Sequence, residues 1–187
     1  MNILLVNNHT KHLKYLNKAL AGHNVEVVMY QPGVQFNYRD KDLIVLSGGG
    51  GEGLEIDDKV QSGKLWYEDE MKFILKCDKP ILGICMGFEV IARSFGSQVK
   101  QMETGLLEGF HKIITTKRGK EVFDKDRLRQ YEAHEWSVEY IDPEEFEVLA
   151  ASHTGIEIIK HKKRPILATQ FHPEKGGTLS LPRLLTI

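Results

Sequence analysis

The chain contains the stretch Pro80-Ile81-Leu82-Gly83-Ile84-Cys85-Met86-Gly87-Phe88-Glu89, an apolar run that ends in a cysteine between two glycines. The apolar run predicts a buried strand, and the close glycines allow a sharp, strained corner into a following helix. The free N–H groups and partial positive charge of a helix N-terminus lower the pKa of a thiol, so we expect Cys85 to be a reactive thiolate. The alternative is a buried structural cysteine.

A second buried strand is predicted over residues 165–171, and it runs directly into His172-Pro173-Glu174. A thiol nucleophile needs a base, and the base needs an acceptor that orients it. His172 and Glu174 supply both, and Pro173 stiffens the link between them. Because both strands are predicted to lie in the core, the cysteine corner and the His-Pro-Glu segment together indicate a catalytic triad.

These motifs resemble those of the class I glutamine amidotransferases, whose glutaminase domains carry a Gly-x-Cys-x-Gly elbow and a distant His-Pro-Glu. The resemblance covers nearly the whole chain, since residues 1–8 are similar to the first strand of the family and residues 43–51 to its strand and glycine loop. It implies that Cys85 is the nucleophile, His172 the base and Glu174 the group that orients the base.

The glycine run Gly48–Gly51 has several interpretations. A phosphate-binding Walker loop would continue with Gly-Lys-Ser or Gly-Lys-Thr, and a dinucleotide fingerprint would lead at once into a helix; the residues that follow fit neither. A flexible turn is the plain alternative. The family resemblance implies instead that backbone N–H groups at Gly49 and Met86 stabilise an oxyanion, and that Gly50 and Gly51 contact the substrate.

The resemblance also implies a reaction. Cys85 attacks the side-chain amide of glutamine, a γ-glutamyl thioester forms, and protonated His172 gives its proton to the departing ammonia. Water then cleaves the thioester. Ammonia normally travels to a synthetase active site in this family, and the chain carries no ATP-pyrophosphatase signature. The expected partner is therefore a separate synthetase subunit.

The elbow departs from the family pattern at Phe88 and Glu89. Amidotransferases commonly have Leu-Gly-His-Gln or a close variant after the cysteine, where the glutamine side chain contacts the substrate. A Phe-Glu pair resembles γ-glutamyl hydrolases, which share the triad and act alone on other γ-glutamyl amides. A carboxylate at Glu89 could still accept a hydrogen bond from the α-ammonium group of glutamine. The substrate therefore stays open between glutamine and another γ-glutamyl amide.

The middle of the chain favours an amidotransferase. Residues 131–136 occupy the place of the histidine-containing segment that helps glutaminase subunits to bind glutamine, so His134, Glu135 and Trp136 are candidate substrate contacts beside Glu89. A structural or surface role is the alternative for His134. Residues 143–150 resemble the same part of the glutaminase subunits of GMP synthases, enzymes of nucleotide biosynthesis. The third hypothesis, after the glutamine amidotransferase and the hydrolase, is an inactive regulatory homologue.

Composition excludes several other classes. The 187 residues predict one domain over 1–187 with a substantial core, and the net charge of −1 argues against a nucleic-acid surface. No membrane segment and no signal peptide are expected, and the two cysteines do not form a disulfide framework, so we expect a reducing cytoplasm. Five histidines are expected to be solvated because they lack metal-ligand spacing, namely His9, His12, His111, His153 and His161. Neither a metal site nor a cofactor is expected.

Short apolar runs alternate with helical segments in the first half of the chain, which favours a parallel sheet covered on both faces. From Val99 onward the pattern changes to strands, several of them expected to pair antiparallel. The charge-rich segment Lys117–Arg129 is expected to be a solvated loop or a short helix. With the resemblance, this predicts an α/β protein with the three-layer, flavodoxin-like class I glutamine amidotransferase fold, built on a mostly parallel, partly mixed central sheet.

Overall fold

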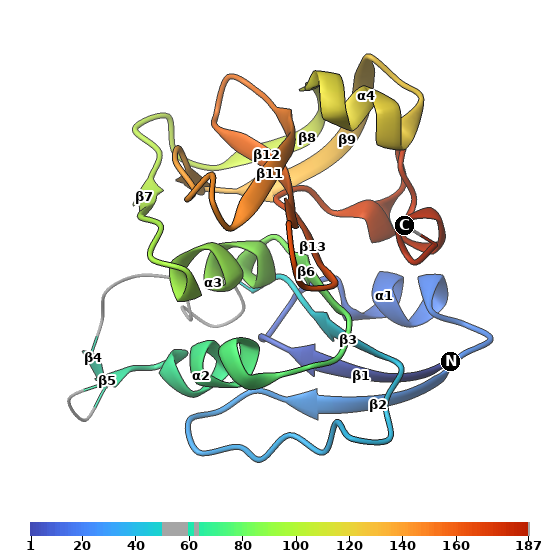
Figure 1. Ribbon diagram of the computed structural model, residues 1–187, viewed down its shortest axis with the longest axis vertical. Coiled ribbons are helices and arrows are strands. Elements are labelled where there is room, and N and C mark those ends of the chain that lie inside the picture. Colours follow the sequence, from blue (N-terminus) through green and yellow to red (C-terminus); the bar gives the residue numbers. More distant parts are fainter. Residues whose placement is uncertain (50–59, 62–63, 187) are drawn as a thin grey trace.

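Five strands form the parallel half of a nine-stranded sheet in the computed structural model, which describes residues 1–49, 60–61 and 64–186 (Figure 1). In spatial order they are β2 (Asn24–Met29), β1 (Asn2–Asn7), β3 (Leu43–Leu46), β6 (Ile81–Ile84) and β13 (Ile166–Thr169). The last four are apolar and almost wholly buried, as is typical of parallel strands covered on both faces. Because parallel strands end at the same edge of a sheet, the segments that follow β3, β6 and β13 lie together.

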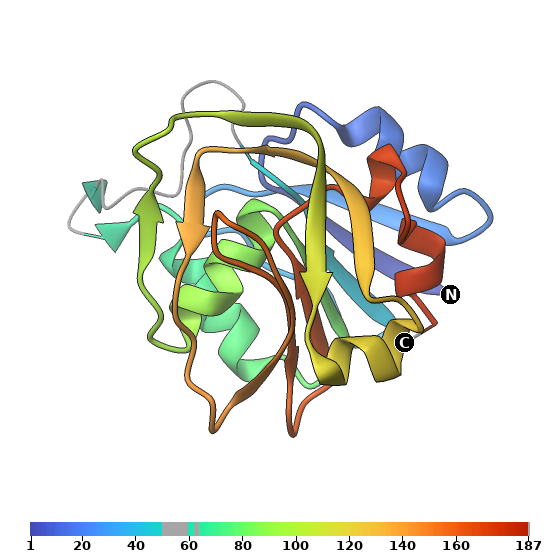
Figure 2. The same ribbon diagram turned by 90° about the horizontal axis from the view of Figure 1, so that it is seen from above.

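The second half of the sheet is antiparallel, as the sequence predicted. It continues from β13 through β12 (Ile156–His161), β11 (Phe146–Ala151), β8 (Leu107–Thr115) and β9 (Arg127–His134). Figure 2 shows β8 and β9 running side by side, and a short helix connects them. The sheet curls, since the backbone N–H of His172 donates to the carbonyl of Tyr131 on β9 over 2.8 Å. Strand β9 therefore returns to the edge where β13 ends.

Helices cover both faces of the sheet, which confirms the predicted three-layer α/β fold (Figures 1 and 2). Helices α2 (Glu68–Lys76) and α3 (Met86–Ser94) pack on one face. The other face carries α1 (Leu13–Ala19), α4 (Lys117–Phe123) and α5 (Leu181–Leu184). No helix within the described ranges is long and apolar enough to cross a membrane.

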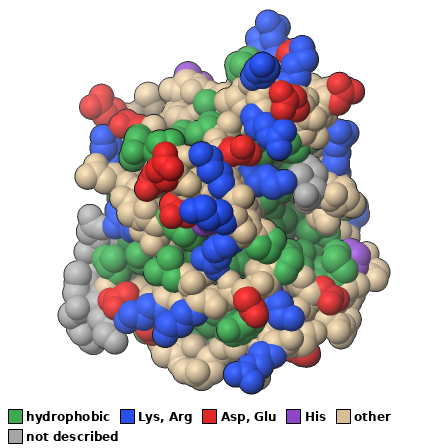
Figure 3. Space-filling view, in the orientation of Figure 1, with side chains coloured by type: hydrophobic (Ala, Val, Ile, Leu, Met, Phe, Trp, Pro, Cys, Tyr) green, Lys and Arg blue, Asp and Glu red, His purple; other side chains and the backbone are tan. Residues whose placement is uncertain are grey.

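Smaller elements complete the description. Two short antiparallel pairs join β7 (Val99–Gln101) to β10 (Trp136–Val138) and β4 (Val60–Gln61) to β5 (Lys64–Leu65). A 3-10 turn, η1 (Pro173–Lys175), follows β13. On the face shown in Figure 3, Lys and Arg side chains are interspersed with Asp and Glu.

The interpretation of Lys117–Arg129 as a solvated loop or short helix is partly wrong. Helix α4 forms, but strand β9 already begins at Arg127. The buried face of β9 carries mostly polar residues, namely Leu128, Gln130, Glu132 and His134. The alternation of buried and exposed positions is therefore invisible to a search for apolar periodicity.

Candidate active site

Cys85 lies at the corner between β6 and α3, with φ 51° and ψ −108°. A positive φ is uncommon for a residue other than glycine, so this is the strained corner that the sequence predicted. The flanking glycines are required by close contacts. A Cβ atom on Gly87 would meet the backbone of Leu46, and one on Gly83 would lie 2.8 Å from the carbonyl oxygen of Gly87. Strand β6 and helix α3 can therefore approach each other and β3 only with glycine at both positions.

His172 and Glu174 form a buried pair in the segment after β13. Oε1 of Glu174 lies 2.8 Å from Nδ1 of His172, and both side chains are less than a tenth exposed. The carboxylate accepts the hydrogen of Nδ1 and leaves Nε2 for the thiol. Among the residues that the structure describes, this buried Nε2 atom has no hydrogen-bond partner.

Gly48 stands between the base and the nucleophile. A Cβ atom at this position would lie 2.9 Å from Cε1 of His172 and 3.4 Å from Cβ of Cys85. The two side chains therefore flank the same glycine although they come from the ends of different strands. The structure thus brings together the three residues of the predicted triad.

The expected low pKa of the Cys85 thiol is wrong for the free pocket. Burial raises the pKa of Cys85 well above its ordinary value, and the negative charges of Glu89 and Glu174 raise it further. The backbone N–H of Met86 lowers the pKa, as the helix argument proposed, but this effect is smaller. The thiol donates a weak hydrogen bond from Sγ to the carbonyl of Ala133 at 3.9 Å. These effects favour the neutral thiol of Cys85 over the thiolate.

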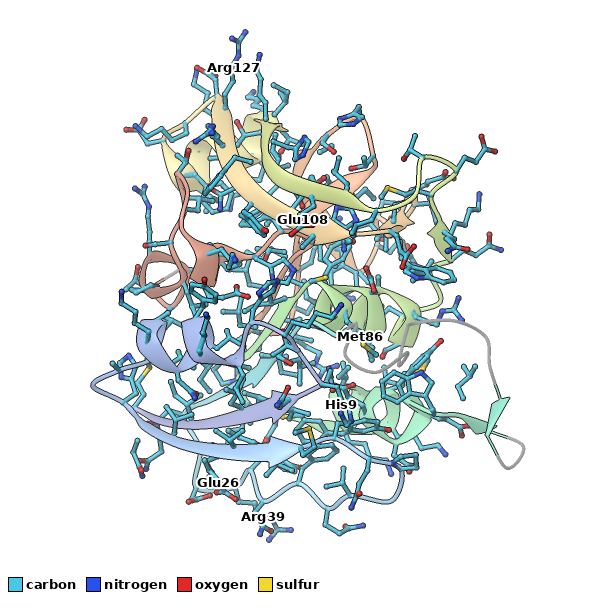
Figure 4. The ribbon with its side chains drawn as sticks, turned by 180° about the vertical axis from the view of Figure 1, so that it is seen from behind. His9, Glu26, Arg39, Met86, Glu108 and Arg127 are labelled. Atoms are coloured by element: carbon cyan, nitrogen blue, oxygen red, sulfur yellow. The ribbon has the colours of Figure 1, made fainter. Side chains whose placement is uncertain are left out.

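The predicted oxyanion-hole residues Gly49 and Met86 are neighbours. A Cβ atom on Gly49 would contact Sδ of Met86 and would lie 3.2 Å from its Cβ atom. Figure 4 labels Met86 at the start of α3. The predicted contacts Gly50 and Gly51 lie outside the described residues.

The glycine loop is held by residues that sequence reasoning did not select. The backbone N–H of Asn8 donates to Oγ of Ser47 over 2.8 Å, and this hydroxyl donates to the carbonyl of Gly48 over 2.8 Å. Nδ2 of Asn8 donates to Oε1 of the buried Glu70 over 3.0 Å. The sequence signal for this role was the polar pair Asn7-Asn8, which directly follows the first apolar run.

A cavity of about 260 Å³ opens over Cys85. All four predicted substrate contacts in the described part of the chain line it, namely Glu89, His134, Glu135 and Trp136. Sequence reasoning did not select five further lining residues, namely Lys11, His12, Leu106, Glu108 and Ala133. Figure 4 shows Glu108 on β8 and Met86 on α3, so both the antiparallel and the parallel halves of the fold contribute to the walls.

His12 belongs to the site, so its interpretation as a solvated side chain is wrong. Its ring lines the cavity and meets the ring of His172 edge-on, with the centroids 4.7 Å apart. Burial lowers the pKa of His12 to about 4, and the positive charges of His172 and Lys175 act in the same direction. His161 is also buried rather than solvated, and its ring packs against Phe95 and Phe146.

Comparison with known proteins agrees with this geometry. The family model described as glutamine amidotransferase class-I matches residues 4–186. The chain is 30% identical to the glutamine-hydrolysing GMP synthase subunit of Methanothermobacter thermautotrophicus, with 94% of this chain and 90% of the relative covered. It is also 30% identical to the protein of the same name from Methanosphaera stadtmanae, with 95% and 91% covered.

A solved structure shows the same fold. The crystal structure of a glutamine amidotransferase from Thermotoga maritima superposes with a TM-score of 0.72, at 19% sequence identity, over 93% of this chain and 76% of that one. The family match over residues 4–186 extends across both halves of the sheet. This chain belongs to the class I glutamine amidotransferase family.

Proposed function

We propose that the protein hydrolyses the side-chain amide of glutamine through a γ-glutamyl thioester on Cys85 and delivers the ammonia to a separate synthetase subunit of the GMP synthase type. The observation that carries this proposal is the buried His172–Glu174 pair, placed across Gly48 from the strained Cys85. The relatives named as glutamine-hydrolysing GMP synthase subunits support the choice of partner. Cys77 and Cys85 are both free thiols, which fits a reducing cytoplasm.

The proposed reaction begins with a proton transfer. As Sγ of Cys85 attacks the amide carbon, the thiol proton passes to Nε2 of His172, and Glu174 stabilises the resulting imidazolium. The N–H groups of Gly49 and Met86 hold the oxyanion. The C–N bond then breaks, His172 returns the proton to the departing ammonia, and water hydrolyses the thioester to glutamate with His172 as the base.

The charges in the cavity suit a free amino acid. Lys11 can pair with an α-carboxylate, while Glu89, Glu108 and Glu135 offer acceptors for an α-ammonium group. Glu89 is buried, and burial raises its pKa to about 7, with a hydrogen bond from Gln170 acting in the opposite direction. An ammonium group beside Glu89 would offset the negative charge that raises the thiol pKa. Substrate binding would therefore activate the nucleophile.

A stand-alone γ-glutamyl hydrolase is the second candidate function, and the residue that favours it is Glu89. Phe88 does not bear on the choice, because its side chain is fully buried in the core and is absent from the cavity lining. An inactive regulatory homologue would have no need of the intact triad. The choice between the two active candidates therefore depends on what the carboxylate of Glu89 binds.

The deciding experiment measures glutamate release from glutamine and from several γ-glutamyl amides, with and without a purified GMP synthase-type synthetase subunit. A weak basal glutaminase activity that rises in the complex is expected. Cys85→Ala serves as the control, and its activity is expected to fall to background. Strong turnover of another γ-glutamyl amide without the partner would overturn the amidotransferase proposal. Full activity of Cys85→Ala would overturn both active candidates.

A further inference from the structure

Three buried side chains outside the triad converge behind the wall of the cavity. Glu132 and His134 come from β9 and Glu157 from β12, and their exposed fractions are 1%, 5% and 1%. One candidate ligand atom from each lies within 4.8 Å of the other two. Alternate residues of a strand share a face, so Glu132 and His134 point the same way. The curl of the sheet brings them to β12, although two strands separate β9 from β12 in hydrogen-bonding order.

With both carboxyl groups ionised, the converging atoms are all acceptors. Nδ1 of His134 lies 2.7 Å from the carbonyl oxygen of Trp136, so this nitrogen carries the hydrogen of the neutral ring and Nε2 presents a lone pair. That Nε2 atom is 3.2 Å from Oε2 of Glu132. Within the described ranges, four of these buried atoms have no hydrogen-bond partner, namely both carboxylate oxygens of Glu132, Nε2 of His134 and Oε2 of Glu157. Such a group is stable only with cations or protons between its members.

Neighbouring residues hold two of the three groups in position. The carbonyl of Trp136 fixes the ring of His134, as described above. Oε1 of Glu157 accepts hydrogen bonds from Oγ of Ser152 at 2.6 Å and from Oγ1 of Thr154 at 3.2 Å, which leaves Oε2 for the converging group. Metal-binding histidines and carboxylates are typically oriented by hydrogen bonds of this kind.

We propose that Glu132, His134 and Glu157 bind one divalent transition-metal ion, with zinc as the best-fitting class. One imidazole nitrogen and two carboxylate oxygens suit zinc, whereas magnesium and calcium require more oxygen ligands. Two carboxylates also balance the charge of a divalent ion. Zinc ligands at bond lengths of about 2.1 Å stand about 3.4 Å apart in a tetrahedron, so the side chains close in slightly on binding.

The ion would stabilise the wall of the cavity. His134 and Trp136 line that wall, and a metal bond between β9 and β12 would fix both residues relative to Cys85. The expectation that the chain has no metal site rested on spacing along the sequence. Glu157 follows His134 by more than twenty residues, so only the curl of the sheet brings the three residues together.

The test is a zinc titration of the full chain in a Cys85→Ser background, which prevents the nucleophile from binding zinc itself. A chelator first removes bound metal from the protein. Zinc is then titrated into the protein in competition with a chromogenic chelator, and the melting temperature is measured with and without one equivalent of zinc. One equivalent is expected to bind and to raise the melting temperature. Glu157→Gln is expected to weaken binding at least tenfold, whereas Glu103→Gln, at an exposed site, should leave the affinity unchanged.

Two results would overturn the proposal. One is zinc affinity in Glu157→Gln equal to that of the Glu103→Gln control. The other is that the folded Cys85→Ser protein binds no zinc and that adding Glu157→Gln makes it more stable. This result would show that protons, and not a metal ion, occupy the group. If Glu157→Gln does not fold, cobalt(II) in the Cys85→Ser protein gives the answer. A visible spectrum of four-coordinate nitrogen and oxygen ligation supports the site, and the spectrum of the hydrated ion contradicts it.

Discussion

Gln170 donates a hydrogen bond from Nε2 to Oε1 of Glu89 over 2.7 Å, and both side chains are buried. Gln170 lies two residues before His172, and Glu89 lies four residues after Cys85. This one hydrogen bond therefore joins the two segments that carry the proposed triad beside the cavity. It also holds a carboxylate close enough to Cys85 to raise the pKa of the thiol.

Removing this charge should make the nucleophile more acidic. Glu89→Gln keeps the shape of the side chain and eliminates the negative charge that raises the pKa of Cys85. We expect the rate of alkylation by iodoacetamide at pH 7.5 to rise several-fold, with the whole pH profile moved to lower pH. Glu108→Gln, which removes an exposed carboxylate from the same cavity, is the control and should leave the profile in place. Identical profiles for the two variants would show that Glu89 does not set the thiol pKa.

Gly48 should tolerate no side chain. A Cβ atom there would lie 2.9 Å from Cε1 of His172, so Gly48→Ala must displace the base. Misplacement by about 1 Å can cost about 100-fold in rate, and we expect kcat to fall by 10- to 100-fold on this scale. Gly22→Ala is the control. A Cβ atom at Gly22 would meet nothing within 4 Å, although the backbone of Gly22 has a φ of 94°. This control variant should lose about 1 kcal/mol of stability and keep its kcat. Full activity of Gly48→Ala would contradict the described position of His172.

Glu174 should act through His172. Glu174→Gln replaces the carboxylate that accepts the Nδ1 hydrogen and stabilises the imidazolium, so kcat for glutamine should fall by about 100- to 10,000-fold with little change in KM. The matched control is Glu145→Gln, because Glu145 lies 3.2 Å from Nε2 of His161 in a pair remote from the triad. Glutaminase kinetics of the complex would measure both. Equal effects of the two substitutions would assign Glu174 a merely structural role.

The proximity of the three residues of the proposed triad could be predicted from sequence because short motifs carry them. The glycines on either side of Cys85 specify the corner at the cysteine, and Pro173 links His172 to Glu174. The apolar run before each motif predicted that each motif lies at the end of a strand. The pKa of Cys85 could not be predicted in this way. The helix N-terminus is a local feature, whereas the burial that dominates the pKa of the thiol, and the approach of Glu174, arise only through the fold. Strand β9 was missed for a related reason, since the partners of a buried polar side chain such as Gln130 lie far along the sequence: Nε2 of Gln130 donates to the carbonyl of Leu179.

The buried Glu70 predicts how stability depends on pH. Burial raises the pKa of Glu70 to about 7, with the hydrogen bond from Asn8 acting against it, while a glutamate in the unfolded chain titrates near its usual value of about 4.3. Between these values the folded protein holds a proton that the unfolded chain has released. The free energy of unfolding should therefore fall as pH rises from about 4.5 to 7, by at most about 4 kcal/mol from this group.

Glu70→Gln removes this contribution and keeps an acceptor for Asn8. We expect urea denaturation to give a smaller decline in unfolding free energy between pH 5 and pH 8 for Glu70→Gln than for the unsubstituted protein. The variant should therefore gain relative stability as the pH rises. Glu68→Gln, on the same helix and paired with Lys72 at the surface, is the control and should keep the full decline. A slope unchanged in Glu70→Gln would mean that Glu70 is already ionised in the folded protein at pH 5.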